Sequence, residues 1–260
     1  MNHANTGSTT VQHKKSLGQR MKENYEFRAQ THLTRRTPVI IRLDGRSFHT
    51  LTKRFKLEKP FDLKFNSWMQ ETVIALCEEI QGAKLGYTQS DEISILMVDY
   101  DNLDSEAWFN YNVQKVVSVS ASIATEAFTN AMINDGRCWP VSFDSRAFNI
   151  PREEANNYFV WRQQDWIKNS VQMLARAHYS HKELQSKNQS DMHEMLYQKG
   201  INWANLEDWK KNGVTFTKEV YDRSDGGSEL VIRHSWDDDP TLIFSKEPKV
   251  VNELIGLKND

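Results

Sequence analysis

Two apolar runs of strand length lie in the N-terminal part of the chain. Residues 37–43 and 93–98 are rich in β-branched side chains, which is typical of buried strands. Between them, residues 61–80 repeat apolar side chains at helical spacing, which predicts an amphipathic helix with Pro60 at its first turn. This stripe consists of Phe61, Phe65, Trp68, Met69, Val73, Leu76 and Ile80.

The pattern continues with a predicted hairpin, a second helix and a fourth strand. Residues 83–87 and 93–98 pair around a tip at residues 88–92, residues 105–132 form the helix, and residues 141–148 form the strand. The resulting order, β-α-β-β-α-β, is that of the ferredoxin-like fold, which polymerase palms and nucleotide cyclases share. We therefore expect an α+β, palm-like catalytic domain over residues 17–150.

The remaining segments have simpler patterns. Residues 1–16 are polar and predict a flexible tail, followed by a short helix over residues 16–28. Residues 151–260 predict a C-terminal extension, helical to about residue 200, with two strands at residues 213–221 and 229–236 joined by a turn at residues 224–227. We expect this helical and β-hairpin extension to pack with the palm as one unit.

Carboxylates stand at the edges of two predicted strands. Asp44 follows the first strand, with Gly45 beside it, and Asp91 and Glu92 come directly before the third. In the ferredoxin-like order the end of the first strand lies beside the hairpin tip, so Asp44 and Asp91 are expected to be neighbours in space. Two acids held in this way are typical of sites that bind two divalent cations over a triphosphate.

Each candidate residue also has a simpler interpretation. Asp44-Gly45 is equally consistent with a turn after a strand, and Asp91-Glu92 with a solvated hairpin tip, although adjacent acids repel each other and favour a nearby cation. The amides of residues 46–49 form a phosphate-binding nest if they curl at the strand end, and His49 either caps that turn or contacts a nucleotide. Lys115 is either a surface lysine or a phosphate contact from the second helix.

Composition and charge narrow the classes of partner. Residues 14–59 contain 13 Lys and Arg against 4 Asp and Glu, a charge of +9, so with a total of −2 the rest of the chain carries −11. This asymmetry suits a polyanion such as RNA, or a triphosphate, and is equally the pattern of a solvated basic surface. No apolar run reaches the length of a membrane span, and Cys77 and Cys138 lack metal-ligand spacing, so we expect a cytoplasmic protein with reduced thiols and no membrane partner.

The motifs of several enzyme classes are absent from the sequence. The sequence contains no P-loop and no GxGxxG, which disfavours Walker-type ATPases and Rossmann dehydrogenases. His178, His181 and His193 have no companion ligands at zinc spacing. No Ser-His-Asp or Cys-His arrangement is apparent, which agrees with metal-assisted transfer that needs no protein nucleophile.

At these residues the chain resembles the tRNA(His) guanylyltransferases and the tRNA(His) guanylyltransferase-like proteins. The resemblance runs from about residue 25 to about residue 220 and is carried by four segments in the family's order. These are Arg42-Leu43-Asp44-Gly45-Arg46-Ser47-Phe48-His49, Gln89-Ser90-Asp91-Glu92, Phe143-Asp144-Ser145-Arg146 and Trp161-Arg162-Gln163.

The resemblance implies a polymerase palm that adds nucleotides to the 5′ end of tRNA in the 3′-to-5′ direction. It implies that Asp44 and Asp91 bridge two Mg²⁺ ions, that the Gly45 carbonyl is a further ligand, and that Glu92 supports the cluster. It also implies that the nucleoside triphosphate is held by Asp44, Gly45, Arg46, Ser47, Phe48 and His49 together with Ser90 and Asp91. Lys115 is expected to touch its phosphates. The implied substrates are ATP, GTP and other NTPs. The resemblance also suggests a homo-oligomer, and in particular a tetramer.

The stretch from Trp166 to Gln172 departs from the one that eukaryotic-type guanylyltransferases carry there, with only Ile167 and Asn169 in agreement. The resemblance therefore implies the guanylyltransferase-like branch, which resembles a templated repair enzyme for 5′-truncated tRNA activated by ATP. Untemplated addition of G to tRNA(His), a palm-type nucleotide cyclase and a non-catalytic RNA-binding palm are the alternatives.

Overall fold

The computed structural model describes residues 15–223 and 231–257. In this part of the chain six strands form one antiparallel sheet in the order β4-β1-β3-β2-β5-β6. The strands are β1 (Val39–Gly45), β2 (Ala83–Gln89), β3 (Glu92–Met97), β4 (Phe143–Asn149), β5 (Val214–Arg223) and β6 (Val231–Asp239). The first four have the ferredoxin-like order, which confirms the predicted fold class.

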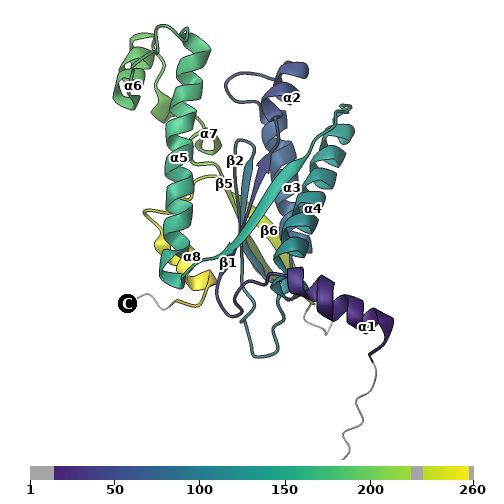
Figure 1. Cartoon of the computed structure of the whole chain (residues 1–260). Helices are drawn as coiled ribbons and strands as arrows, with labels where there is room; N and C mark the ends of the chain where they lie inside the picture. The colour runs from purple at the N-terminus through teal and green to yellow at the C-terminus, as the bar shows by residue number, and fades with distance from the viewer. Residues whose placement is uncertain (1–14, 224–230, 258–260) are drawn as a thin grey trace, which may run out of the picture.

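Helices cover both faces of the sheet (Figure 1). The α-helices are α1 (Leu17–Met21), α2 (Phe48–Arg54), α3 (Leu63–Glu79), α4 (Val113–Asn134), α5 (Arg152–His178), α6 (Gln189–Gln198), α7 (Asp208–Asn212) and α8 (Pro248–Leu254). Shorter π and 3₁₀ turns are η1 (Lys22–Glu26), η2 (Phe27–Ala29), η3 (Trp108–Tyr111) and η4 (Trp203–Asn205). Figure 1 shows α3 and α4 on one face and α5 with α8 on the other, with α5 extending past the sheet to carry α6.

The strand alternation of β1 decides where its polar residues point. Val39, Ile41 and Leu43 belong to the core under α3 and α4, whereas Ile40 belongs to the core under α5 and α8. Because successive side chains of a strand point to opposite faces, Arg42 and Asp44 lie on the α5 face of the sheet. Asp44, at the end of β1, therefore lies between the sheet and α5.

Two predicted helix starts are wrong. The first long helix, α3, begins at Leu63 and not at residue 61, because the Asp62 side chain caps it by accepting from the Phe65 amide at 3.0 Å. Pro60 therefore precedes the first turn. α4 begins at Val113 because its Asn112 cap accepts from the Lys115 amide at 3.1 Å, after the irregular η3.

The C-terminal extension continues the palm sheet. β5 pairs with β2, and the buried Gln163 of α5 donates to the carbonyls of Asn212 (3.1 Å) and Leu242 (2.9 Å). Both predicted strands of the extension are present, and most of their predicted turn, residues 224–227, lies outside the described residues, as does most of the predicted tail. The short α2 and α8 were not predicted.

α4 has the length and composition of a membrane-spanning helix, with a mean hydropathy of 1.3. The expectation that no segment is long and apolar enough is therefore wrong by that criterion. In this fold the helix packs its buried side chains, including Val116, Ala124 and Phe128, into the core shared with α3. Its apolar content is consistent with a core helix.

Candidate active site

The β2–β3 turn brings the predicted acids together at one end of the central strands. Asp44 is the register partner of Glu92, and the Gly45 amide donates to the Asp91 carbonyl at 2.9 Å. Ser90 makes the tight turn with a left-handed φ of 52°, and its hydroxyl donates to the Asp91 carboxylate at 3.1 Å. Asp44 and Asp91 are therefore neighbours, as the strand order predicted.

Glu92 has a different role from the two aspartates. Its carboxylate is buried and accepts from Arg162 Nε at 2.6 Å and Arg162 Nη2 at 2.8 Å, and Arg42 also donates to it. Both oxygens are therefore occupied by guanidinium groups. Glu92 links β3 to α5 and so supports the site, whereas Asp44 and Asp91 form no ion pair among the described residues.

The electrostatics of the two aspartates favour a cation. Burial raises the pKa of Asp44, and the charges of Glu92 and Asp144 raise it further. Burial also raises the pKa of Asp91, with the nearby charge of Asp44 as the second cause. The repulsion between the two ionised carboxylates raises the free energy of the charged pair. A divalent cation bound between them offsets this repulsion.

The donor set fits Mg²⁺ in a particular way. Carboxylate and carbonyl oxygens are its preferred ligands, and it is usually bound by one or two carboxylates together with substrate phosphates. Among the described residues no group of three or more His, Cys, Asp or Glu side chains is arranged around a metal position. Asp44 and Asp91 therefore suit an ion that arrives with a triphosphate better than a fully enclosed structural ion.

The raised pKa values predict a pH-dependent effect of Mg²⁺ on stability. A carboxyl whose pKa is raised by folding contributes stability below its unfolded pKa and loses it as pH rises through the folded pKa. At neutral pH the metal-free protein therefore carries the repulsion of Asp44 and Asp91. We expect Mg²⁺ to raise the unfolding temperature at pH 7 and progressively less as the pH falls toward these pKa values.

Thermal unfolding with Mg²⁺ or with the chelator EDTA, at several pH values, measures this effect. Asp44→Asn should raise the metal-free unfolding temperature at neutral pH and abolish the response to Mg²⁺. A response to Mg²⁺ that is equal in wild type and Asp44→Asn would show that the ion binds elsewhere.

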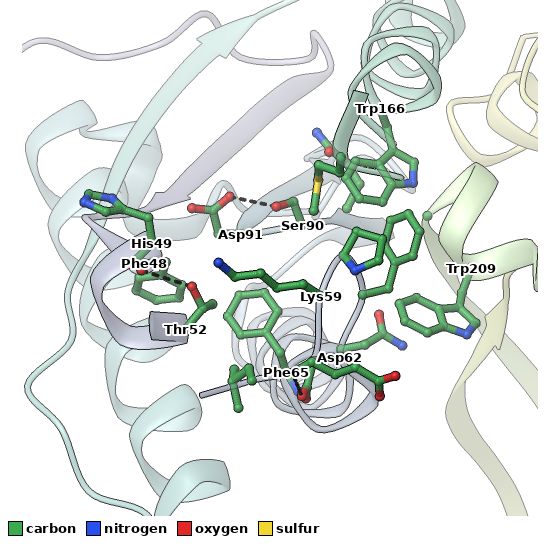
Figure 2. A pocket seen from close by; sticks show the side chains of 18 of the residues that line it. Phe48, His49, Thr52, Lys59, Asp62, Phe65, Ser90, Asp91, Trp166 and Trp209 are labelled. Atoms are coloured by element: carbon green, nitrogen blue, oxygen red, sulfur yellow. Dashed lines mark hydrogen bonds between the residues drawn. The ribbon is translucent and has the colours of Figure 1, made fainter. Parts of the chain in front are cut away.

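A cavity of about 420 Å³ opens on one side of Asp91, which is within the size range of small-molecule sites. Figure 2 shows its walls: Trp166 and Trp209 on one side, His49 and Thr52 on the other, and Phe65 below. The Lys59 side chain extends into the cavity, with its ammonium group directed toward Asp91 and His49 (Figure 2). The cavity thus combines aromatic walls with a cation and an acid.

A second cavity of about 330 Å³ lies between the sheet edge and α5. It is lined by Asp44 and Glu92 from the strands and by Asn169, Gln172 and Arg176 from the helix. Ser90, Asp91 and Trp166 line both cavities. Asp91 therefore lies where two ligand-sized spaces meet, and Asp44 lines the second of them.

The predicted phosphate-binding segment is only partly directed into these cavities. Ser47 is left-handed, with a φ of 58°, and its side chain does not cap α2, so the first amides of that helix have no side-chain partner there. Phe48 is buried among aromatic rings of the core, and His49 is exposed and lines the first cavity. Arg46 is exposed at the sheet edge, where its amide donates to the Ser142 carbonyl.

The expected contact of Lys115 with the triphosphate is not supported within one chain. α4 leads into β4, which begins opposite Gly45, so the C-terminal end of the helix lies at the acid edge. Lys115 is in the first turn of this 22-residue helix, at the far end, with its ammonium over the Phe109 ring at 5.8 Å. Lys59 is the lysine that the fold brings to the site.

Three site residues were not identified from the sequence. Arg162 lies in a segment that supported the resemblance, but only the structure shows its pairing with Glu92. Lys59 reaches the cavity from a loop and Trp166 reaches it from α5. The periodic pattern of the sequence does not predict either position.

Comparison with known proteins shows which family the chain resembles. Residues 18–151 match the family model described as Thg1: tRNAHis guanylyltransferase. The tRNA(His) guanylyltransferase of Schizosaccharomyces pombe is 27% identical over 209 residues, covering 72% of this chain and 76% of its own.

Two solved structures are also similar. A bacterial tRNA(His) guanylyltransferase (Thg1)-like protein in complex with ATP superposes with a TM-score of 0.84 at 42% identity, covering 94% of this chain and all of that one. A second structure of such a protein, in complex with GTP, has a TM-score of 0.79 at 40% identity and the same coverage of 94%.

A ferredoxin-like palm with Asp44 at the end of β1 and Asp91 in the β2–β3 turn has the architecture of a nucleotidyltransferase. Within that class, the family match and the coverage of these relatives are decisive. The chain belongs to the tRNA(His) guanylyltransferase family.

Proposed function

We propose that this chain adds nucleotides to the 5′ end of tRNA in the 3′-to-5′ direction, as a templated repair enzyme for 5′-truncated tRNA. In this reaction ATP first adenylylates the 5′-monophosphate and releases pyrophosphate. The 3′-hydroxyl of an incoming NTP then attacks the activated phosphate and AMP leaves. The observation that carries the proposal is the position of Asp91 at the junction of two cavities, with Asp44 beside it in the second.

Such a reaction requires room for two reactants beside one set of acids. The first cavity, with its aromatic walls and the Lys59 ammonium, suits an activating nucleotide that places its base among the rings and its phosphates near Asp91. The similar bacterial proteins are in complex with ATP and with GTP, which supports the binding of a nucleoside triphosphate by this chain. The second cavity, lined by Asn169 and Gln172, suits the incoming NTP or the RNA end.

Asp44, Asp91 and the Gly45 carbonyl are the groups proposed to hold Mg²⁺. When bound, Mg²⁺ lowers the pKa of an attacking hydroxyl and neutralises charge on a leaving phosphate. Arg162 and Arg42 are bound by Glu92, and neither guanidinium forms an ion pair with Asp44 or Asp91 among the described residues. This separation prevents an arginine from occupying the cation position.

Lys59→Ala should weaken the activation step selectively. Lys59 forms no ion pair within the described residues, so its ammonium is free for a phosphate. A hydrogen bond to a charged group is worth about 1.5–3 kcal/mol, so we expect the KM for ATP to rise about tenfold or more. Single-turnover adenylylation of 5′-monophosphorylated tRNA measures it.

Lys64→Ala is the matched control, because Lys64 lies nearby in the first turn of α3 but pairs with Asp135 at 2.8 Å outside the cavity. It should leave the KM for ATP unchanged. Equal effects of the two substitutions would remove Lys59 from the nucleotide site.

The choice between templated repair and untemplated addition of G is tested with truncated tRNAs that differ only in the base opposite the missing nucleotide. We expect addition of whichever NTP pairs with that base, on more than one tRNA. Pairing aligns the 3′-hydroxyl with the activated phosphate, and a misplacement of about 1 Å costs on the order of a hundredfold in rate. Addition of G regardless of that base, and only to tRNA(His), would replace this proposal with the untemplated activity.

A further inference from the structure

Trp161 is a large aromatic side chain left 52% exposed close to the acid pair. Its neighbours in α5, Phe159 and Arg162, are buried. A single exposed aromatic is unremarkable on a protein surface. Trp161 differs from other exposed aromatic residues because its ring contacts Arg42 and Arg162, which also bind Glu92 in the active site.

The indole is held in one orientation by cations and by a second ring. The Arg162 guanidinium lies 4.4 Å from the ring centroid and that of Arg42 lies 5.7 Å from it, while the Tyr158 ring packs edge-on at 5.9 Å. Both guanidiniums are in turn bound by Glu92, the strand partner of Asp44. The exposed part of the ring is therefore preorganised relative to Asp44.

The surface beside Trp161 is open. β4 is the edge strand of the sheet, and its Asp144 and Arg146 side chains, on the same face, are 57% and 54% exposed. Trp161 lines neither of the two cavities. A nucleotide enclosed in either cavity does not use this ring, whereas the end of an RNA duplex lying across the open face reaches it.

The charges of this surface are already paired. Asp144 accepts from Arg146 at 2.8 Å, and Glu92 binds both Arg42 and Arg162. Contact here is consequently made by the face of a ring and not by attraction of phosphates. Stacking on an aromatic ring accepts any base, since every base has a π face.

We propose that the exposed indole of Trp161 stacks on the 5′-terminal base of the tRNA acceptor stem and places its phosphate at Asp44 and Asp91. This inference rests on the proposed function and adds a contact that selects no base. A stacking contact of this kind is compatible with repair of several tRNAs, because the choice of nucleotide is left to pairing.

The test uses a 5′-truncated tRNA that carries the fluorescent base 2-aminopurine at its 5′ end. Wild type should quench its fluorescence on binding, and Trp161→Phe should largely retain this. Trp161→Leu, which keeps apolar bulk without a π face, should lose the quench and bind the tRNA about tenfold more weakly, a loss of roughly 1.4 kcal/mol. The dissociation constant for ATP and the slope of tRNA affinity against salt should not change, because Trp161 lies outside the nucleotide cavity and neutralises no phosphate charge.

Phe109→Ala is the control for the loss of an exposed aromatic, since Phe109 is 39% exposed beside Lys115 at the far end of the sheet. Normal quenching in Trp161→Leu would overturn the inference, as would a weakened affinity for ATP or a changed salt slope in that variant. These outcomes are distinct from failure of the proposed function, which would appear as absence of 5′ extension by wild type.

Discussion

Asp44→Ala and Asp91→Ala are each expected to reduce nucleotide addition about a thousandfold or more while leaving the fold intact. Metal ions stabilise the charge of such transition states by several kcal/mol, and each ~1.4 kcal/mol is a factor of ten in rate. Removing one acid leaves a single carboxylate for the two like-charged Mg²⁺ ions of the proposed site, so both ions are bound together less often. Single-turnover extension of truncated tRNA at saturating NTP measures the loss.

Both substitutions should also leave the protein at least as stable without metal, because they relieve repulsion within the pair. Asp101→Ala is the matched control, since Asp101 is an exposed acid paired with Lys84 at the opposite end of the strands. It should retain full activity. Near-normal rates for Asp44→Ala or Asp91→Ala at ordinary Mg²⁺ concentrations would contradict the assignment of these acids.

Arg162→Ala is expected to be the most destabilising substitution around the site. It removes two hydrogen bonds from the buried Glu92 carboxylate and leaves Arg42 as the remaining cation. Breaking a buried ion pair costs about 3–5 kcal/mol. For a chain of this size each 1 kcal/mol shifts the unfolding temperature by roughly 2–4 °C, so we expect a fall of about 6 °C or more.

Lys84→Ala provides the comparison, because it breaks an exposed ion pair with Asp101 that is worth at most about 1 kcal/mol. The double variant Arg162→Ala, Glu92→Gln should be less destabilised than the sum of the two single variants, since the uncompensated charge is then absent. Strict additivity in calorimetric unfolding would indicate that Arg162 and Glu92 do not interact as this geometry requires.

The fold and the acid pair were predictable because both follow from local patterns. The apolar runs of β1 and β3 are buried on both faces, and an antiparallel neighbour relationship brings Asp44 to Asp91 in any ferredoxin-like order. The stripe of α3 is likewise a local signal, and it identified the helix although Asp62, not Pro60, sets its start.

The rest of the site depends on tertiary placement. The direction of α4 carries Lys115 away from the acids, and the periodic pattern of a helix contains no information about which end lies at the site. Lys59 enters the cavity from a loop, and Arg162 reaches Glu92 across 70 residues of sequence. Such contacts become visible only when α5 is packed on the sheet.

The most direct test of the central claim is a single incubation of the purified protein with Mg²⁺, ATP, the complementary NTP and a 5′-truncated tRNA labelled at its 5′-monophosphate. The account predicts an adenylylated intermediate followed by a tRNA one nucleotide longer at its 5′ end, and no extension when ATP or the tRNA phosphate is omitted. A cyclic nucleotide formed from NTP alone, extension at the 3′ end, or binding of tRNA without any product would contradict it.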